Sequence, residues 1–242
     1  GNALYVGANG GINAKYCQSL FYGYYNVLEI NFNHCFHTDY ATSMKSMFDY
    51  CPSLRALDVS DFSTDNVTDM AGMFYQCSSL TSLDLSDFNT SKVTDMGNMF
   101  AYCDGLTNLD LSNFDTSAVT DMRGMFVRTG ATTLDLSSFD TRAVTDMGMM
   151  FYGIKAPTLD VSHFNTSAVL DMSGMFLDAN ELTTLDIRNF DTSAVTDMSN
   201  MFSGTRALTT LDVRNFNTSS VTNMTSMFSG TRALTKLDLS NF

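Results

Sequence analysis

Glutamate is nearly absent from this 242-residue chain, which contains only Glu29 and Glu181 although it carries 26 acidic residues in all. The acidic side chains are therefore almost entirely aspartates, and short polar side chains of this kind compete with the helical backbone for hydrogen bonds. This composition favours turns, caps and strand ends over long surface helices. Charged residues make up 16% of the chain and hydrophobic residues 44%, which is enough to bury a sizeable core.

Basic residues are also scarce. The 13 lysines and arginines leave a formal net charge of −13, and no window of five residues forms a basic patch. We therefore expect no nucleic-acid partner, and an anionic membrane surface would repel the chain. No stretch of 18 apolar residues exists, so no segment is expected to insert into a bilayer. No signal peptide is recognisable, and because the sequence starts at Gly1 rather than at Met, we expect any targeting segment to lie outside it.

The most prominent feature present is an internal repeat of 25 or 26 residues. Its first leucine recurs with spacings of 26, 26, 25, 25, 26, 26 and 26 residues, at Leu57, Leu83, Leu109, Leu134, Leu159, Leu185, Leu211 and Leu237. A period this regular indicates a solenoid or an array. A degraded copy begins at Ile30, so we assign residues 30–242 to about eight tandem repeats, the last one truncated. Residues 1–29 do not fit the unit and are interpreted as an N-terminal cap on the first coil.

Each unit has the pattern of a short strand followed by a short helix. In residues 80–86, Leu83 and Leu85 alternate with Asp84, which predicts a half-buried strand with both leucines on its inner face. In residues 93–100 the apolar side chains recur with helical spacing, at Val93, Met96, Met99 and Phe100. We therefore predict an α/β solenoid, a leucine-rich-repeat-like right-handed coil. One parallel sheet with strands about 4.8 Å apart would lie on one side, and short helices or 3-10 turns on the other.

The unit L-D-[LVI]-[SR]-x-F-[DNS]-T-x-x-V-[TL]-[DN]-M-x-x-M-F resembles the 25-to-26-residue leucine-rich repeats of BspA-like bacterial surface proteins, among them lipoproteins and cell-wall-anchored proteins. The resemblance covers residues 30–242. It implies an exported, extracellular protein that is anchored to the cell surface or secreted, attaches to host or microbial surfaces and has no catalytic activity. This chain departs from ordinary leucine-rich repeats where their strand motif ends in asparagine, because phenylalanine stands there, as at Phe62 and Phe88.

A row of aspartates is the main candidate for binding. Alternation along the strand places one aspartate of each repeat on the outer face, at Asp58, Asp84, Asp110, Asp135, Asp160, Asp186, Asp212 and Asp238. Unit charges 4 Å apart repel by about 1 kcal/mol even in water. The row either binds a cationic patch, a hydroxyl-rich glycan or divalent cations, or it consists of solvated carboxylates bonded to adjacent Ser and Thr. Arg188 and Arg214 replace the serine at the end of two strands, can reach toward the neighbouring aspartates, and mark one end of this predicted strand face.

A second aspartate series precedes the first methionine of each predicted helix, at Asp69, Asp95, Asp121, Asp146, Asp171 and Asp197, with Asn223 in the same position. Helix capping explains both residue types there. The Met and Phe residues are interpreted as core, and so are Cys51, Cys77 and Cys103. Coils on the helical side would lie about 10 Å apart, too far for disulfides between these cysteines. Cys17 and Cys35 could form a bridge within the N-terminal segment.

Metal binding and catalysis find little support. The segment His34-Cys35-Phe36-His37 has no second cluster at zinc spacing, and the calcium-loop pattern D-x-[DN]-x-[DN]-G does not occur, so no metal site is assigned. The motifs G-x-S-x-G, H-E-x-x-H and G-x-G-x-x-G and the P-loop are also missing, so we expect neither an enzyme nor a cofactor.

We predict a binding or adhesion module that uses the strand face to contact proteins or glycans of host or microbial surfaces. The alternative is a structural stalk that holds another domain away from the cell wall and has no ligand; an enzyme is a distant third. The strand from Leu237 to Phe242 has no cap in the sequence. Because unpaired strand edges template association, we also expect end-to-end self-association at this end.

Overall fold

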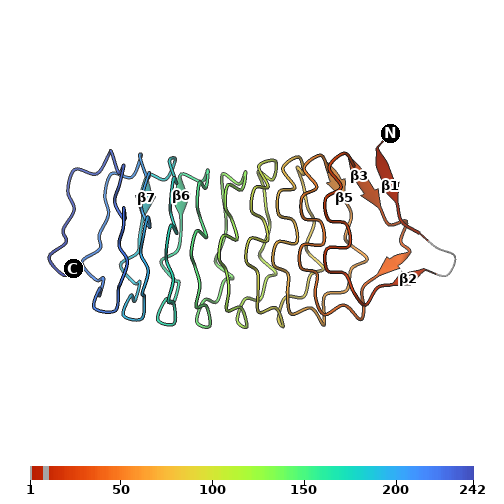
Figure 1. The fold of residues 1–242 in the computed structure, drawn as a ribbon, viewed down its shortest axis with the longest axis horizontal. Coiled ribbons are helices and arrows are strands. Elements are labelled where there is room, and N and C mark those ends of the chain that lie inside the picture. Colours follow the sequence, from red (N-terminus) through yellow and green to blue (C-terminus); the bar gives the residue numbers. More distant parts are fainter. Residues whose placement is uncertain (1, 8–10) are drawn as a thin grey trace.

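The computed structural model describes residues 2–7 and 11–242. The chain winds through successive coils, one for each sequence repeat, which stack side by side along one long axis with the two termini at opposite ends (Figure 1). Equivalent segments of neighbouring coils pair in parallel. Some of these pairs are short strands, and the others are single bridges that run from Ser43 to Asn223. The prediction of parallel strands stacked at the period of the repeat is confirmed.

The regular strands are short. β1 (Ala3–Tyr5), β3 (Glu29–Asn31) and β5 (Ala56–Leu57) form one parallel sheet in the order β1-β3-β5, with Leu4 opposite Ile30 and Ile30 opposite Leu57. β2 (Ile12–Asn13) pairs in parallel with β4 (Phe36–His37), and β6 (Thr158–Leu159) pairs in parallel with β7 (Thr184–Leu185). β3, β5, β6 and β7 each hold the leucine or isoleucine that opens a repeat, as the alternating pattern predicted.

A second backbone ladder runs along the opposite side of the coils, at the segment that begins with the second aspartate series. Parallel bridges join the same position of every coil from Ser43 to Asn223. Within this segment alternate N–H groups donate to carbonyls of the next coil, as from Met70 to Asp95 (2.9 Å) and from Phe74 to Met99 (3.1 Å). We call this side the Met–Phe face. Its coils are held together by backbone hydrogen bonds along most of the molecule.

No helix occurs among the residues that the structure describes, so the predicted short helices are wrong, and the alternative of isolated turns closed by bonds over three residues describes this side of the coils. Two residues of each coil, four positions apart, take left-handed backbone conformations, for example Asn98 (φ 56°) and Tyr102 (φ 58°). They break the helical path into separate turns, each closed by a local bond such as that from the Met99 N–H to the Met96 carbonyl (3.2 Å). A left-handed non-glycine residue costs about 1–2 kcal/mol, which the bonds to the next coil offset. Both conformations bury Met96, Met99 and Phe100, so sequence spacing could not separate them.

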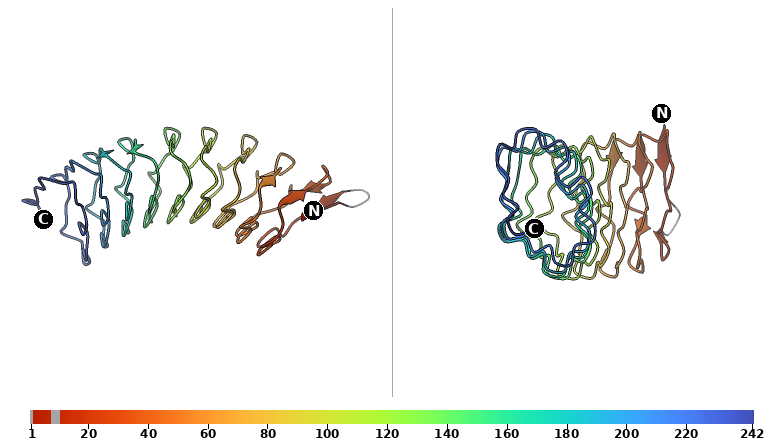
Figure 2. Two further views of the ribbon diagram at one scale, coloured as in Figure 1. Left: turned by 90° about the horizontal axis from the view of Figure 1, so that it is seen from above. Right: turned by 60° about the vertical axis from the view of Figure 1, so that its left-hand side comes forward.

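The stack is curved, and the Leu-Asp-Leu segments lie on its outer side. Seen from above, the coils splay apart on the side that carries the strands and come close together on the opposite side (Figure 2). Among the described residues, no strand pairing joins the Leu-Asp-Leu segments between β5 and β6, whereas the Met–Phe face is bridged throughout. The expected continuous sheet with 4.8 Å spacing on the strand face is therefore wrong. We refer below to the convex strand face and the concave Met–Phe face.

Side chains connect the splayed coils of the convex side instead of a backbone ladder. Asn113 Nδ2 donates to the carbonyls of Leu85 (2.9 Å) and Phe88 (3.0 Å) in the preceding coil. Asn215 repeats this contact, and His163 Nε2 lies 3.0 Å from the carbonyl oxygen of Leu136. These side-chain bonds join neighbouring coils at places where the described residues form no strand pairs.

The core consists of stacked rows with one residue from each coil. One phenylalanine row has ring centroids 5.7–6.1 Å apart and runs through Phe48, Phe74, Phe100, Phe126, Phe151, Phe176, Phe202 and Phe228. A second row consists of buried threonines. Thr64 Oγ1 donates to the carbonyl of Asn89 (3.0 Å) and accepts from its N–H (2.7 Å), so the hydroxyl satisfies two backbone groups of the next coil. Threonine thus does the backbone bonding that an asparagine ladder does in ordinary leucine-rich repeats.

All five cysteines are free thiols, so Cys17 and Cys35 are not bridged. Cys51, Cys77 and Cys103 are buried as predicted, and the thiol of Cys77 donates to the Phe48 carbonyl of the preceding coil (3.1 Å). They lie at the end of the concave Met–Phe face, so the separation of about 10 Å expected between their coils is wrong. Burial raises the pKa of Cys103 to about 12, which keeps this thiol protonated at neutral pH.

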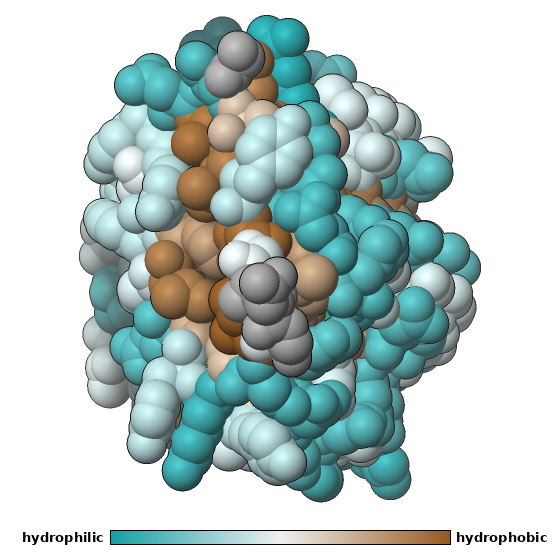
Figure 3. All heavy atoms as spheres, turned by 90° about the vertical axis from the view of Figure 1, so that its right-hand side faces the viewer, coloured by the Kyte–Doolittle hydropathy of each residue, from teal (hydrophilic) through white to brown (hydrophobic). Residues whose placement is uncertain are grey.

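The described part of residues 1–29 adds one more coil ahead of the first repeat. β1 and β2 pair with β3 and β4, and Phe21 extends the phenylalanine row onto Phe48 with centroids 5.5 Å apart. Viewed from this end, a band of apolar residues runs between hydrophilic borders (Figure 3). At the other end Leu239 and Phe242 are 41% and 37% exposed. The N-terminal cap and the end-to-end association stay predictions.

Candidate functional site

The predicted aspartate row lies on the convex strand face, where its eight side chains are exposed or half-buried. In each coil the carboxylate oxygen Oδ1 accepts a hydrogen bond from the N–H two residues further on. Asp110 accepts from Ser112 at 3.0 Å and Asp135 from Ser137 at 2.9 Å. This turn fixes the orientation of each carboxylate within its own coil.

The local bonds determine how the row ionises. Bonds from the following serine lower the pKa of Asp84 and of Asp110, and bonds from Arg188 and Arg214 lower the pKa of Asp186 and of Asp212 to about 2. Because these pKa values are lower in the folded chain than in the unfolded one, the bonds stabilise the fold above about pH 4, and this contribution is lost as the pH falls through the folded pKa. The whole row is therefore charged at neutral pH.

The two predicted arginines bind the aspartates of their own coils. Arg188 donates from Nε to Asp186 Oδ1 (3.0 Å) and from Nη2 to Oδ2 (2.7 Å), and Arg214 binds Asp212 in the same way (2.9 and 2.7 Å). In these two coils both carboxylate oxygens are occupied. In the other six, Oδ2 makes no hydrogen bond to any described residue. The row thus keeps six free acceptor oxygens.

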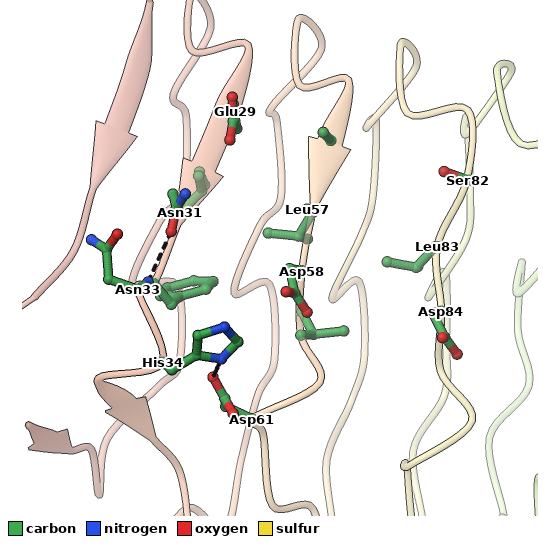
Figure 4. A pocket seen from close by; sticks show the side chains of 14 residues that line it. Glu29, Asn31, Asn33, His34, Leu57, Asp58, Asp61, Ser82, Leu83 and Asp84 are labelled. Atoms are coloured by element: carbon green, nitrogen blue, oxygen red, sulfur yellow. Dashed lines mark hydrogen bonds and ion pairs between the residues drawn. The ribbon is translucent and has the colours of Figure 1, made fainter.

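Three hollows open over this row, between the splayed coils. The largest has a volume of about 620 Å³ and lies near the N-terminal end (Figure 4). Its polar lining comes from three successive coils and includes Glu29, Asn31, His34, Asp58, Asp61 and Asp84, with Leu57 and Leu83 among them. His34 Nδ1 lies 2.8 Å from Asp61 Oδ2, so this side-chain contact connects two coils beside the hollow.

The other two hollows continue along the same face. One of about 480 Å³ is lined by Asp110, Asp135 and Asp160 together with threonines, and one of about 460 Å³ is lined by Asp186, Asp212, Asp238, Arg188, Arg214 and Lys236. The structure therefore brings the predicted residues together in groups of two or three coils. The first two hollows are acidic, and the third carries both signs of charge.

The second aspartate series forms a separate row on the concave Met–Phe face. These side chains are half-buried, and each caps a turn rather than a helix, as Asp95 does by accepting from the Gly97 N–H (2.9 Å). Burial, with repulsion from neighbouring carboxylates, raises the pKa of Asp95 and of Asp146. Arg123 lies within the row, 2.9 Å from Asp171 and 3.5 Å from Asp146. The predicted capping role holds in this changed form.

We expect Asp95→Asn to raise the free energy of unfolding at pH 7 by about 0.5–1 kcal/mol. The amide can accept the Gly97 N–H as the carboxylate does, and Asn223 of the same row shows the further bond it can make, to Asp197 Oδ2 (3.0 Å). The raised pKa of Asp95 means that folding disfavours its charged form. The gain therefore shrinks as the pH falls through the folded pKa, where Asp95 becomes neutral.

Urea titrations at pH 7 and at pH 4, followed by circular dichroism, measure this effect. Asp110→Asn is the control on the convex strand face, because its carboxylate has a lowered pKa and its removal brings no gain. An equal gain in both variants would show that net charge, rather than the half-buried row, is responsible.

One row of side chains was missed in the sequence. Tyr22, Tyr50, Tyr75 and Tyr102 pack ring to ring across four coils with centroids 5.5–5.7 Å apart. We call them the tyrosine row. Tyrosine does recur shortly after the Met–Phe pair of the repeat, but Tyr50 and Tyr102 follow the phenylalanine by two residues and Tyr75 by one. An exact repeat alignment therefore hides the row.

Nowhere in residues 2–7 and 11–242 do three or more His, Cys, Asp or Glu side chains form a group that could hold a metal ion. The same part of the chain contains no helix with the length and apolar character needed to cross a membrane. What the convex strand face offers chemically is a set of oriented, ionised acceptors.

Comparison with known proteins identifies a family. The family model described as Mycoplasma protein of unknown function, DUF285, matches residues 16–133, 42–163 and 126–242. No curated protein and no solved structure matches. The three overlapping matches together cover the tandem repeats and nearly the whole chain. This chain therefore belongs to the DUF285 family of Mycoplasma proteins of unknown function.

Proposed function

We propose that this chain is a binding module of a bacterial surface or secreted protein, and that its convex strand face attaches to glycans or proteins of host or microbial surfaces. Six carboxylate oxygens left free by the protein's own hydrogen bonds carry this proposal. Each belongs to a carboxylate whose other oxygen is fixed by a backbone N–H. The acceptors are thus oriented before a ligand arrives, which lowers the entropic cost of binding.

The chemistry of the row selects the class of partner. Free carboxylate oxygens accept hydrogen bonds from hydroxyl groups and attract ammonium or guanidinium groups. Because the same acceptor recurs in successive coils, a polymer with repeated hydroxyl groups can contact several coils at once, and weak contacts then add up through effective concentration. The resemblance to the repeats of BspA-like surface proteins supports an extracellular location and a role in adhesion.

A screen of glycans and extracellular matrix proteins, with and without calcium, tests the proposal. We expect reversible binding that falls by about tenfold or more in the double variant Asp110→Asn with Asp135→Asn, because each lost charge-assisted bond weakens binding severalfold. The matched control is Asp115→Asn with Asp191→Asn. Those aspartates also accept the N–H of a following serine, but they occupy a position where Asn89 and Asn165 occur naturally. Equal losses in both pairs would contradict a site on the convex strand face.

A stalk without a ligand is the second candidate function, and the continuity of the stack favours it. The backbone ladder of the concave Met–Phe face and the phenylalanine row both run through almost every coil without interruption. Such a stack can hold another domain at a distance. Deleting interior coils and restoring the length with an unrelated spacer separates the two functions, because attachment of cells survives this change only if the chain is a stalk.

A further inference from the structure

A notch on the margin of the concave Met–Phe face is lined by more basic than acidic side chains, unlike the three hollows of the convex strand face. It has a volume of about 490 Å³ and spans several coils, lined by Tyr102, Asp104, Arg128, Gly153, Lys155, Asp178, Asn180 and Arg206. Three of the 13 basic residues of the chain line this one notch, although the protein has a net charge of −13. Two carboxylates lie among them, so the bases outnumber the acids locally.

The basic side chains of the notch are only weakly engaged by the protein. Lys155 Nζ lies 3.5 Å from Asp104 Oδ1, and both side chains are about half exposed. Arg128 and Arg206 are exposed and have no carboxylate oxygen within 4.0 Å among the described residues. The paired Arg188 and Arg214 of the convex strand face contrast with them. Two guanidinium groups in the notch thus keep their donors for an external anion.

The backbone creates the space. The last residue of the concave ladder is left-handed in each coil, and in two of the coils that form the notch it is a glycine, Gly153 (φ 64°) and Gly204 (φ 75°). A Cβ on Gly153 would lie 3.0 Å from Arg128 Cγ, so the arginine side chain extends over this glycine toward the following coil. The missing side chains make room for the side chains of Arg128 and Asp178, which both line the notch.

An aromatic surface adjoins the notch. Tyr102 is half-buried, lines the notch, and is the last member of the tyrosine row, with its ring 5.6 Å from that of Tyr75. The row continues away from the notch over Tyr50 to Tyr22, which is 50% exposed. Tyrosine combines an apolar ring with a hydroxyl that forms hydrogen bonds, which suits the face of a sugar ring, where apolar C–H groups alternate with hydroxyl groups.

We propose that the notch and the tyrosine row together bind an acidic oligosaccharide, with a carboxylate or sulfate group of the sugar between Arg128 and Arg206 and neighbouring rings on Tyr102 and Tyr75. Guanidinium groups match the planar geometry of carboxylates and the oxygens of sulfate. Asp104 and Asp178 accept hydrogen bonds from sugar hydroxyls beside that anion. This inference rests on the proposed function of surface binding, and it assigns a ligand class to a second face of the molecule.

Calorimetry with four probes tests the inference: a heparin hexasaccharide, a hyaluronan hexasaccharide, the neutral chitohexaose and inorganic sulfate. We expect the two acidic sugars to bind, with an affinity that decreases as salt increases, and the neutral sugar to bind at least about tenfold more weakly. Arg128→Gln with Arg206→Gln is expected to remove about tenfold or more of the affinity for the acidic sugars. The control pair Arg55→Gln with Arg142→Gln changes the net charge equally, away from the notch.

A second variant separates the ring from the anion. Tyr102→Leu is expected to weaken the binding of the acidic sugars about threefold or more. The weak competition of inorganic sulfate with these sugars is expected to stay unchanged. Three results would each overturn the inference. The two double arginine variants could lose the same affinity for acidic sugars, inorganic sulfate could bind as tightly as the acidic sugars, or neither acidic sugar could bind. Loss of acidic-sugar binding in Asp110→Asn with Asp135→Asn would also overturn it, by moving the site to the convex strand face. If the acidic sugars do not bind at the notch, the proposed binding at the convex strand face is unaffected, because the screen with Asp110→Asn and Asp135→Asn tests that face separately.

Discussion

Phe126→Ala is expected to lower the free energy of unfolding by about 3–5 kcal/mol. Phe126 is fully buried, and its ring lies between those of Phe100 (6.1 Å) and Phe151 (5.8 Å) in the phenylalanine row. Truncation removes contacts with both neighbouring coils and leaves a cavity that the stacked backbones on either side cannot close. Urea titration followed by far-ultraviolet circular dichroism measures the change.

Phe242→Ala is the matched control, because the side chain of Phe242 is 37% exposed at the end of the stack. We expect it to cost less than about 1 kcal/mol, since little apolar area is lost from the interior. Similar losses in the two variants would contradict a continuous core in which each ring is supported from both sides.

Gly130→Ala is expected to destabilise the fold by about 3 kcal/mol, for a steric reason. Gly130 is buried, and a Cβ built on it would overlap the carbonyl oxygen of Asp104 and lie 2.8 Å from the carbonyl carbon of the same residue. These are backbone atoms of the preceding coil, which cannot rotate away as a side chain can. The expected signature is a lower midpoint of urea unfolding with an unchanged slope, because the amount of buried surface stays the same.

Gly7→Ala provides the comparison for this substitution. A Cβ on Gly7 would meet only Asn33 Nδ2, at the ordinary contact distance of 3.7 Å, so we expect a change within about 0.5 kcal/mol. An unchanged stability of Gly130→Ala would mean that neighbouring coils do not approach as closely as described.

Much of the fold follows from periodicity alone. The recurrence of Leu57 at Leu83 and beyond predicts stacking in register, and alternation around Leu83 predicts which side chains face inward. The helices could not be excluded in this way. A helix and a series of turns with left-handed residues both bury Met96 and Met99, and only the bonds between coils, which have no local sequence signal, decide between them. Glycine at several of the left-handed positions, as at Gly72 and Gly153, was the available hint.

The candidate sites could also be predicted only in part: the aspartate row was predicted from the sequence, and the curvature and the notch were not. One residue per repeat was enough to place Asp110 and Asp135 on one outer face, and the serine two residues on already indicated how each carboxylate is held. The curvature could not be predicted, because it depends on which side of the coil forms the backbone ladder. The notch could not be predicted for another reason: Arg128 occupies a different position of the repeat from Lys155 and Arg206, and the three residues meet only through the stacking of coils.

From Leu57 onward the coils differ in length at one place only, and this has a consequence for how such chains evolve. Six residues separate Cys103 from Leu109, whereas five separate Thr129 from Leu134. The shorter coils therefore lack one residue in the return stretch between the concave and convex sides. In one of them Gly130 lies in this stretch, close to the backbone carbonyl of Asp104 in the preceding coil. Small insertions and losses there leave every row of side chains aligned. Whole units can then be added or removed without disturbing the rows, and the identical strings at 201–209 and 227–235 fit such copying. The length of the molecule can therefore change in evolution while each remaining coil keeps the contacts to its neighbours.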